Sequence, residues 1–254
     1  IEQVLLNRGI PYIDLKMYLN TTDEMVNSPL MFGENVMRTA ATALIKTIQG
    51  NQKAVLVVDS DCDGFTSSAI LLNYLNNYFP YYVQNCIWYS FHEGKQHGID
   101  IESIPEGTKF IICPDASSEE YDKHTELAAA GIDVLIIDHH NAERVSENAC
   151  IINNQLCDYP TKSLSGVGMV YKFCSYIDEL MNVDYADQFL DLVALGMIAD
   201  MMDLRDFETK HLIHRGLQNI RNPYFKGMVD KQQYSLKDGI TPIGIAFYVA
   251  PYVN

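Results

Sequence analysis

No apolar run in the sequence reaches the roughly 18 residues that a membrane-spanning helix needs. The first residues, Ile1, Glu2 and Gln3, also lack the basic and then apolar order of a secretory signal peptide. We therefore expect no membrane segment and no membrane partner. Because the chain starts without Met and stops abruptly at Asn254, we expect it to be a segment of a longer protein.

Basic residues are scarce. The chain has 18 Lys and Arg against 33 Asp and Glu, which gives a formal net charge of −15. A basic surface is the usual electrostatic footprint of a nucleic-acid-binding protein, so the composition disfavours a broad surface that wraps DNA. Carboxylates gathered in one pocket would instead attract divalent cations, which supply positive charge locally. A metal-dependent enzyme that acts on phosphates therefore remains a candidate.

The sequence also lacks any Cys-x-x-Cys pair. Its six cysteines are scattered through the chain: Cys62, Cys86, Cys113, Cys150, Cys157 and Cys174. Isolated thiols in a chain of this size are typical of a reducing compartment rather than of a disulfide scaffold. We expect ordinary core or loop cysteines and a cytoplasmic protein.

The apolar runs predict an α/β fold, with a parallel β-sheet flanked by helices and with helical additions at both ends. Short runs that end in polar loops alternate with helical patterns, as crossover connections require. The expected strands cover residues 54–58, 109–113 and 133–137, with 83–89 and 149–152 as further candidates. The expected helices cover residues 66–78, about 116–130, and most of the chain from Gly166 onward.

The length of 254 residues and an apolar share of 48% suffice for one large domain with a real core. Val36, Ala40, Leu44 and Ile48 recur at helical spacing. We expect three segments: a helical segment at 1–50 that packs on the core, an α/β domain at 51–204, and a helical connector at 205–254. The connector would lead toward a second domain that is absent from this chain.

Acidic and imidazole side chains follow three of the predicted strands. They are Asp59, Asp61 and Asp63 after the first, Asp115 after the second, and Asp138, His139 and His140 after the third. Because the carboxyl ends of parallel strands lie side by side, these groups are expected to converge. Like charges at that range repel by several kcal/mol unless cations lie between them. Carboxylate with imidazole suits Mn, Zn or Fe, so the sequence predicts a metal site.

Each cluster also has a simpler interpretation. The acidic loop resembles a calcium loop, but Ile70 stands where an EF-hand needs Glu, and a strand precedes the loop where a helix is required. Asp115 alone could cap a helix. Asp200 lies in an apolar stretch where an unpaired acid is costly to bury, so it is either a ligand or a helix-end carboxylate that faces water.

Together these clusters resemble the DHH phosphoesterase family, in which the same groups occur in the same order and at similar spacing. The resemblance rests on residues 58–64, Asp115, residues 138–140 and Asp200. A finer resemblance, to the RecJ-type single-strand-specific nucleases, covers nearly the whole chain. It rests on residues 5–10, 165–168, 194–200, 215–217 and 250–254.

The resemblance implies two divalent ions, Mn²⁺ or, as the second choice, Mg²⁺. Asp63, Asp115, His139 and Asp200 would hold one ion. Asp61 would hold the other together with Asp115, which would bridge the two. Such a pair activates a water for in-line displacement at phosphorus.

His140 would contact the scissile phosphate or the attacking water, and Asp138 would orient the imidazoles. The sequence departs from the family at one position. Many members carry a ligating His two residues before the first Asp of the loop, where this chain has Val57. Asp59 could replace that nitrogen with an oxygen, which would shift the preference toward Mg or Mn.

The segment 91–98 resembles a substrate-side loop of RecJ. His92, Lys95 and His97 are its candidate phosphate contacts, with an ordinary polar loop as the alternative. His211 and His214 share a helix face, but no acid triplet surrounds them, so we assign both to the surface.

The resemblance implies hydrolysis of phosphodiester bonds in single-stranded DNA from the 5′ end. A companion DHH-associated domain, absent from this chain, would close the channel. One alternative is a DHH phosphodiesterase that acts on short oligonucleotides or cyclic dinucleotides and shares the metal site. Another is a metal-free scaffold, as in a degenerate, replication-associated relative of RecJ.

Overall fold

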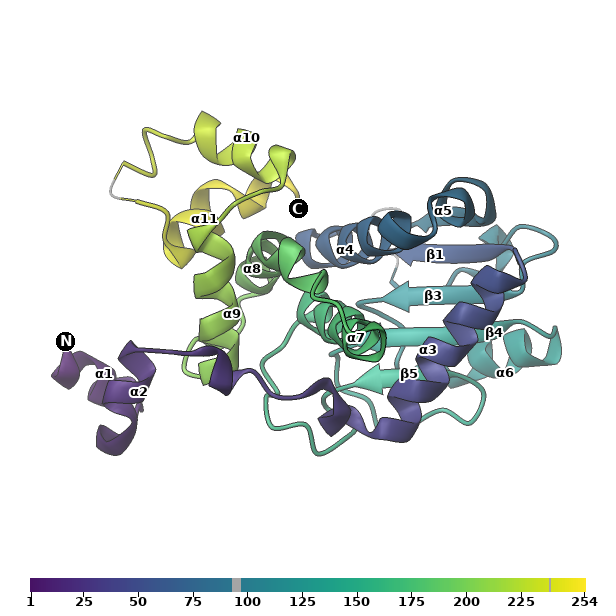
Figure 1. Ribbon diagram of the computed structural model, residues 1–254, viewed down its shortest axis with the longest axis horizontal. Helices are drawn as coiled ribbons and strands as arrows, with labels where there is room; N and C mark the ends of the chain where they lie inside the picture. Colours follow the sequence, from purple (N-terminus) through teal and green to yellow (C-terminus); the bar gives the residue numbers. More distant parts are fainter. Residues whose placement is uncertain (93–96, 238) are drawn as a thin grey trace.

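The described part of the chain is built on one five-stranded parallel sheet. The computed structural model describes residues 1–92, 97–237 and 239–254. The strands lie in the order β2–β1–β3–β4–β5, and each adjacent pair is parallel (Figure 1). Their bounds are β1 Ala54–Val58, β2 Ile87–Phe91, β3 Phe110–Pro114, β4 Asp133–Asp138 and β5 Cys150–Asn153. The predicted α/β fold with a parallel sheet is confirmed.

The predicted strand at residues 83–89 is wrong in its first half. Pro80–Cys86 forms helix α5, and the strand begins only at Ile87. Pro80 stands at the start of α5, where its missing N–H is not needed, and Val83 is buried in the helix. A short apolar run does not distinguish a strand from a buried turn of helix.

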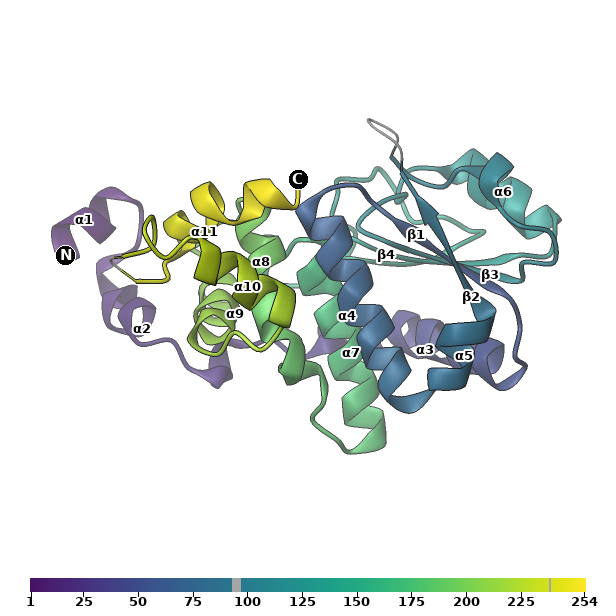
Figure 2. The same ribbon diagram turned by 90° about the horizontal axis from the view of Figure 1, so that it is seen from above.

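Helices cover both faces of the sheet (Figure 2). One face carries α3 Glu34–Gln49, α4 Cys62–Tyr78, α5 and α7 Gly166–Met181, and the other carries α6 Tyr121–Ala129. Along β1 the side chains alternate between two cores. Leu56 and Val58 belong to the larger core, and Val55 and Val57 belong to the smaller one under α6. All of β1 is therefore buried, which explains its continuous apolar sequence.

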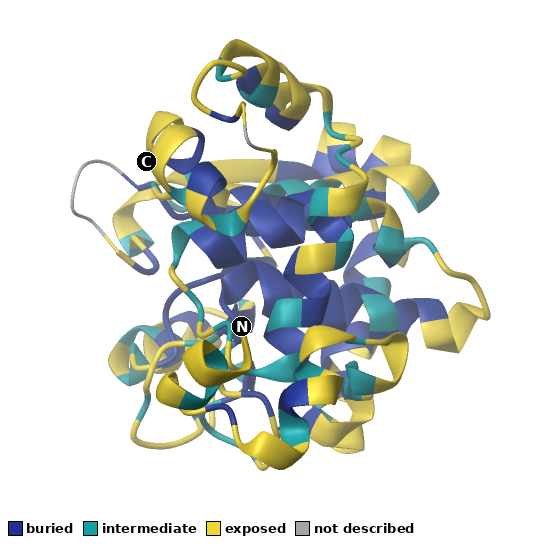
Figure 3. Ribbon diagram, turned by 90° about the vertical axis from the view of Figure 1, so that its left-hand side faces the viewer, coloured by how far each residue is buried: buried dark blue, intermediate teal, exposed yellow. Residues whose placement is uncertain are grey.

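The chain from Gly166 onward is largely helical, as predicted. After α7 come α8 Leu190–Ala199, α9 Phe207–Gln218, α10 Pro223–Lys231 and α11 Pro242–Tyr248. Helix α8 is buried along almost its whole length and packs against α4 on one side and α9 on the other. Figure 3 looks onto this helical end of the molecule, where buried segments are enclosed by exposed ones.

The N-terminal helices divide between the two ends of the molecule. Helix α3 lies against the sheet beside β5, whereas α1 Glu2–Asn7 and α2 Leu15–Leu19 lie near α9 (Figure 1). There Tyr18 packs edge-on against Phe207, with ring centroids 6.1 Å apart. Short 3-10 turns cover Tyr12–Asp14, Asp23–Met25, Pro29–Phe32, Ile101–Ser103, Ala186–Phe189 and Ala250–Tyr252.

A buried ion pair ties the segment before α3 to the helical end. Lys172 of α7 pairs with Glu208 of α9, and each side chain is 1% exposed. Glu208 also accepts hydrogen bonds from the Asn27 backbone N–H at 3.1 Å and from the Tyr159 hydroxyl at 2.9 Å. These bonds satisfy a charge that would otherwise be costly to bury.

The assignment of His211 to the surface is wrong. Its ring is buried, and Nε2 lies 2.9 Å from Oδ1 of Asp23, which also pairs with Arg215 at 3.0 Å. His214, on the same helix, is exposed as expected. The burial of His211 depends on a segment that lies far away in the sequence.

The six cysteines are all free, and four of them are buried in the core. Among the residues that the structure describes, no helix combines the length and the apolar character needed to cross a membrane.

Gly216 lies where α9 packs closely on α8. A Cβ added there would overlap the carbonyl oxygen of Leu190 and approach Cβ of Ala194 to 2.7 Å.

We expect Gly216→Ala to lower the free energy of unfolding by about 1–3 kcal/mol, because the helices must separate. Gly227→Ala in α10 is the matched control, because a Cβ there has no neighbour within 4 Å. It should stabilise the fold by up to about 1 kcal/mol through helix propensity. Urea unfolding measures both, and equal effects would contradict the close α8–α9 contact.

Candidate metal centre

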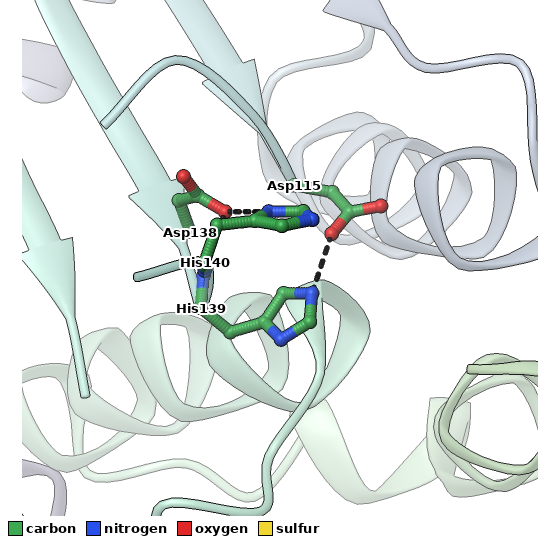
Figure 4. Close-up of side chains that lie close together, drawn as sticks. All are labelled: Asp115, Asp138, His139 and His140. Atoms are coloured by element: carbon green, nitrogen blue, oxygen red, sulfur yellow. Dashed lines mark hydrogen bonds and ion pairs between the residues drawn. The ribbon is translucent and has the colours of Figure 1, made fainter. Parts of the chain in front are cut away.

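The predicted clusters meet at the carboxyl edge of the sheet, where β1, β3 and β4 are neighbours. Figure 4 shows Asp115, after β3, facing the triplet Asp138, His139 and His140 at the end of β4. The potential metal ligands at this edge form groups in which each residue contributes one ligand atom and all of these atoms lie within 4.8 Å of one another. The groups are Asp115–Asp138–His139–His140, Asp63–His139–Asp200 and Asp59–Asp61–Asp115.

Asp63 is positioned by the first turn of α4 rather than by a loop. The helix begins at Cys62, and Asp61 caps it by accepting a backbone hydrogen bond at 2.8 Å. Asp63 is 2% exposed. Its Oδ1 accepts hydrogen bonds from the Ser165 hydroxyl at 2.7 Å and from the Val167 N–H at 3.2 Å. Its Oδ2 is buried without a hydrogen-bond donor among the described residues.

Asp115 has a left-handed backbone, with φ 64°, which Asp and Asn tolerate better than most residues. Its N–H donates to the carbonyl of Ile137 at 2.9 Å, so the ends of β3 and β4 are tied together. The side chain is 2% exposed and packs on Gly166, where an added Cβ would overlap the carboxylate. Asp115 does not cap α6, which begins only at Tyr121.

Asp200 ends α8 instead of lying within it. Its Oδ2 is nevertheless buried without a hydrogen-bond partner, like Oδ1 of Asp115 and Oδ2 of Asp63. These three oxygens surround Nε2 of His139 at 3.5, 3.1 and 3.9 Å respectively (Figure 4 shows the contact with Asp115). One imidazole nitrogen and three carboxylate oxygens therefore face one another. A divalent cation would suit this donor set.

Burial and mutual repulsion oppose ionisation of these carboxyls. Burial, followed by the charges of Asp63 and Asp61, raises the pKa of Asp200 to about 7. The same causes raise the pKa of Asp115 well above its ordinary value. Burial lowers the pKa of His139, which favours a neutral ring with a lone pair. The group therefore holds protons that a metal ion would displace.

Asp138 anchors the two histidines that follow it. Its Oδ1 accepts hydrogen bonds at 2.7 Å from the backbone N–H of His139 and from Nδ1 of His140 (Figure 4 shows the contact with His140). Burial alone would raise the pKa of Asp138, but hydrogen bonds led by that of His140 hold it below its ordinary value. The same hydrogen bond raises the pKa of His140. The geometry is that of a carboxylate that orients an imidazole.

Two residues that position the centre were not predicted from the sequence as site residues. Ser165 holds one oxygen of Asp63. Asn153, the last residue of β5, is buried and donates from Nδ2 to the carbonyl of His140 at 2.9 Å. Asn153 carries the same signal as the acids, because it is a polar residue at the end of a buried strand.

Asp59 faces the segment that follows β2. Its carboxylate lies 2.8 Å from Nδ1 of His92 and 2.6 Å from Nδ1 of His97. His92 is buried and its other ring nitrogen meets a backbone carbonyl, so no nitrogen is left for a phosphate. His97 is exposed and is the better candidate for a substrate contact. Lys95, the third candidate, lies outside the described residues.

Residues 53–197 match the model of the DHH family, N-terminal domain. The chain belongs to the DHH family. The matched region contains all five strands of the sheet and every strand-end cluster of the centre. The predicted family is thus confirmed, and Asp200, which also entered that prediction, lies just after the matched range.

Curated proteins extend the comparison beyond the DHH region. The chain is 40% identical over 256 residues to YorK of Bacillus subtilis (strain 168). The name of YorK describes it as an SPbeta prophage-derived single-strand DNA-specific exonuclease. It is 28% identical over 269 residues to the single-stranded-DNA-specific exonuclease RecJ of the same organism. Both alignments cover 100% of this chain, but only 43% of YorK and 32% of RecJ. The chain thus spans less than half the length of these relatives.

Solved structures show the same fold. A crystal structure of exonuclease RecJ bound to manganese has a TM-score of 0.72 at 21% identity, covering 85% of this chain and 55% of that one. RecJ of Thermus thermophilus in complex with Mn²⁺ has a TM-score of 0.68 at 22% identity, covering 85% and 32%. At such identities the likeness establishes the architecture of the DHH domain.

The affinity of the DHH domain for Mn²⁺ should rise with pH. With a pKa of about 7, the carboxyl of Asp200 is mostly protonated near pH 6 and mostly ionised near pH 8. Binding near pH 6 must therefore release its proton, and the apparent affinity should be on the order of tenfold weaker there. Titration calorimetry in two buffers of different ionisation enthalpy measures both the affinity for Mn²⁺ and the number of protons released on binding. An affinity that does not change with pH, without proton release, would contradict the ligand role of Asp200.

Proposed function

We propose that this DHH domain hydrolyses phosphodiester bonds in single-stranded DNA with two divalent cations. Mn²⁺ is the preferred metal for both positions, and Mg²⁺ is the alternative. The proposal is carried by the three unpartnered carboxylate oxygens that converge on His139. The choice of substrate is supported by the names of YorK and RecJ, which specify single-stranded DNA. The choice of metals is supported by RecJ structures that contain manganese or magnesium.

The ligands divide into two unequal sets. Asp63, Asp115, His139 and Asp200 would hold the first ion, and Asp61 would hold the second together with the bridging Asp115. Two such ions supply an activated water and stabilise the charge on the attacking and leaving oxygens. The left-handed backbone of Asp115 and its backbone bond to β4 would hold the carboxylate in position for this purpose.

We assign the contact with the scissile phosphate to His140. Its Nδ1 is engaged with Asp138, so Nε2 is the nitrogen left for the substrate. The hydrogen bond to Asp138 raises the pKa of His140, which favours an imidazolium that can donate to an anionic oxygen. The ring is 48% exposed, so a phosphate can reach it from solvent.

The negative charge of the chain affects the choice of substrate. With a net charge of −15, the chain itself offers little attraction for a DNA backbone, and such attraction dominates affinity for nucleic acid. A companion DHH-associated domain, inferred from the family resemblance, would supply this grip. Without it, short oligonucleotides or cyclic dinucleotides would be better substrates. The 5′-to-3′ direction also rests on the resemblance to RecJ.

Degradation of single strands labelled at the 5′ or the 3′ end, beside a dinucleotide, tests this function in Mn²⁺. Early release of the 5′ label as a mononucleotide would support the proposed direction. Turnover of the dinucleotide alone would favour the short-substrate alternative. A failure to turn over any substrate or to bind Mn²⁺ would favour the scaffold alternative.

Asp115→Asn should lower the rate of hydrolysis more than about 100-fold, because the change weakens a ligand shared by both ions. Asn is chosen because it tolerates the left-handed backbone at this position. Asp133→Asn, at the exposed amino end of β4, is the matched control and should retain wild-type turnover. Single-turnover rates measure the effect, with circular dichroism as the check on folding. An Asp115→Asn variant as active as this control would refute the bridging role.

The first ion should bind more tightly than the second. The first has four protein ligands, whereas the second has two, with Val57 buried in the core where many family members carry a ligating His. Asp59 is engaged with two histidines. Calorimetric titration with Mn²⁺ should therefore show a tight and a weak step. His139→Ala should remove the tight step, and Asp61→Asn should leave it in place. Two equivalent tight steps would show that this ligand assignment is wrong.

A further inference from the structure

Asp59, His92 and His97 form another group of potential metal ligands, beside the centre described above. One atom from each lies within 4.8 Å of the others. Nδ1 of His92 is 2.8 Å from Oδ1 of Asp59, and Nδ1 of His97 is 2.6 Å from Oδ2. Two imidazole nitrogens thus converge on the two oxygens of one buried carboxylate.

The backbone determines which nitrogen of His92 carries a proton. Nε2 lies 2.5 Å from the carbonyl oxygen of Gly98, and because a carbonyl only accepts, Nε2 must donate. In a neutral ring, Nδ1 then presents a lone pair to the carboxylate of Asp59, and two acceptors at 2.8 Å repel each other. A cation bound by both atoms would remove this repulsion.

The carbonyl of Gly98 is held in place for this contact. Gly98 has φ +85°, and a Cβ there would overlap the carboxylate of Glu120, so only glycine fits. Glu120 also accepts a hydrogen bond from the N–H of Ile99 at 2.8 Å. Histidines that bind metals commonly donate their other ring N–H to a backbone carbonyl in this way. The orientation of His92 is therefore the one that a metal ligand needs.

We propose that Asp59, His92 and His97 bind a third divalent cation, one that prefers imidazole ligands, with Zn²⁺ as its representative. Two imidazoles and one carboxylate, with a fourth position open to water, form a typical zinc ligand set. Mg²⁺ is disfavoured here because it prefers oxygen ligands. The site goes beyond the proposed hydrolysis and does not depend on it.

The third ion would join neighbouring strands at one edge of the centre. Asp59 follows β1, and His92 follows β2, its parallel neighbour. The ring of His97 lies 5.2 Å from that of His140, measured between centroids. The bound ion would fix His97 next to the residue proposed to contact the phosphate. It would also bring nitrogen ligands to the end of β1, where Val57 provides none.

Titration of the metal-stripped chain with Zn²⁺ alone, in competition with a chromophoric chelator, tests this site. His214→Ala is the matched control, because its imidazole is exposed on α9, and it should bind as the wild type does. His97→Ala should bind one equivalent less, or bind that equivalent more than about 100-fold more weakly, because one of three ligands is lost. His92→Ala should have the same effect.

The Asp63→Asn variant tests whether the zinc site is independent of the proposed two-metal centre. In this variant Mn²⁺ binding at the centre should weaken, while the zinc equivalent that depends on His97 is retained. Loss of that equivalent in Asp63→Asn would overturn the idea of a separate site. The proposal would also be overturned if His92→Ala and His97→Ala bound as much zinc as the wild type. Asp59 would then form only ion pairs with His92 and His97. His97→Gln, which should lose the equivalent too, replaces His97→Ala if that variant fails to fold.

Discussion

Repulsion between buried carboxylates at the carboxyl edge of the sheet is the constraint on which the rest of the structure depends. Asp63 and Asp115 are each 2% exposed, and each keeps one oxygen without a donor. An unsatisfied buried polar group costs about 1–3 kcal/mol, and a charged one costs more. That is a sizeable share of a total stability of about 5–15 kcal/mol. Cations between the carboxylates would remove this cost, so the repulsion that destabilises the group would also favour a bound metal ion.

The fold brings this group together from elements that lie far apart in the sequence. The start of α7 contacts two of the acids: Ser165 and Val167 bind Asp63, and Gly166 makes room for Asp115. A helix N-terminus also carries partial positive charge, which favours nearby anions. One oxygen of Asp63 thereby has its hydrogen bonds satisfied, and the other has no hydrogen-bond partner among the described residues. The scaffold thus fixes the carboxylates in place without satisfying all of their oxygens.

Much of this arrangement is predictable from the sequence, because strand ends are predictable. The predicted strands 109–113 and 133–137 and the rule that parallel strands end side by side suffice to place Asp115 near His139. Features that depend on distant contacts are not predictable in this way. His211 is buried and pairs with the distant Asp23, and Asp59 interacts with His97, and both contacts become visible only in three dimensions.

Local sequence also has limits where two structures suit the same residues. Val83 could begin the strand that continues through Ile87, yet residues 83–86 form the end of a helix. Asp200 could be expected inside a helix or at its end, and only the structure shows that it ends α8 with one oxygen buried. In each case the local pattern is compatible with both outcomes, and tertiary packing determines which one forms.

Anomalous X-ray diffraction from crystals soaked in Mn²⁺ tests the central claim most directly, because it locates the ions without relying on activity. The expected result is a strong peak among Asp63, Asp115, His139 and Asp200. A weaker peak beside Asp61 should share Asp115 and should grow with the Mn²⁺ concentration. A peak at Asp61 with none at His139, or no peak at this edge of the sheet at saturating Mn²⁺, would contradict the two-metal centre.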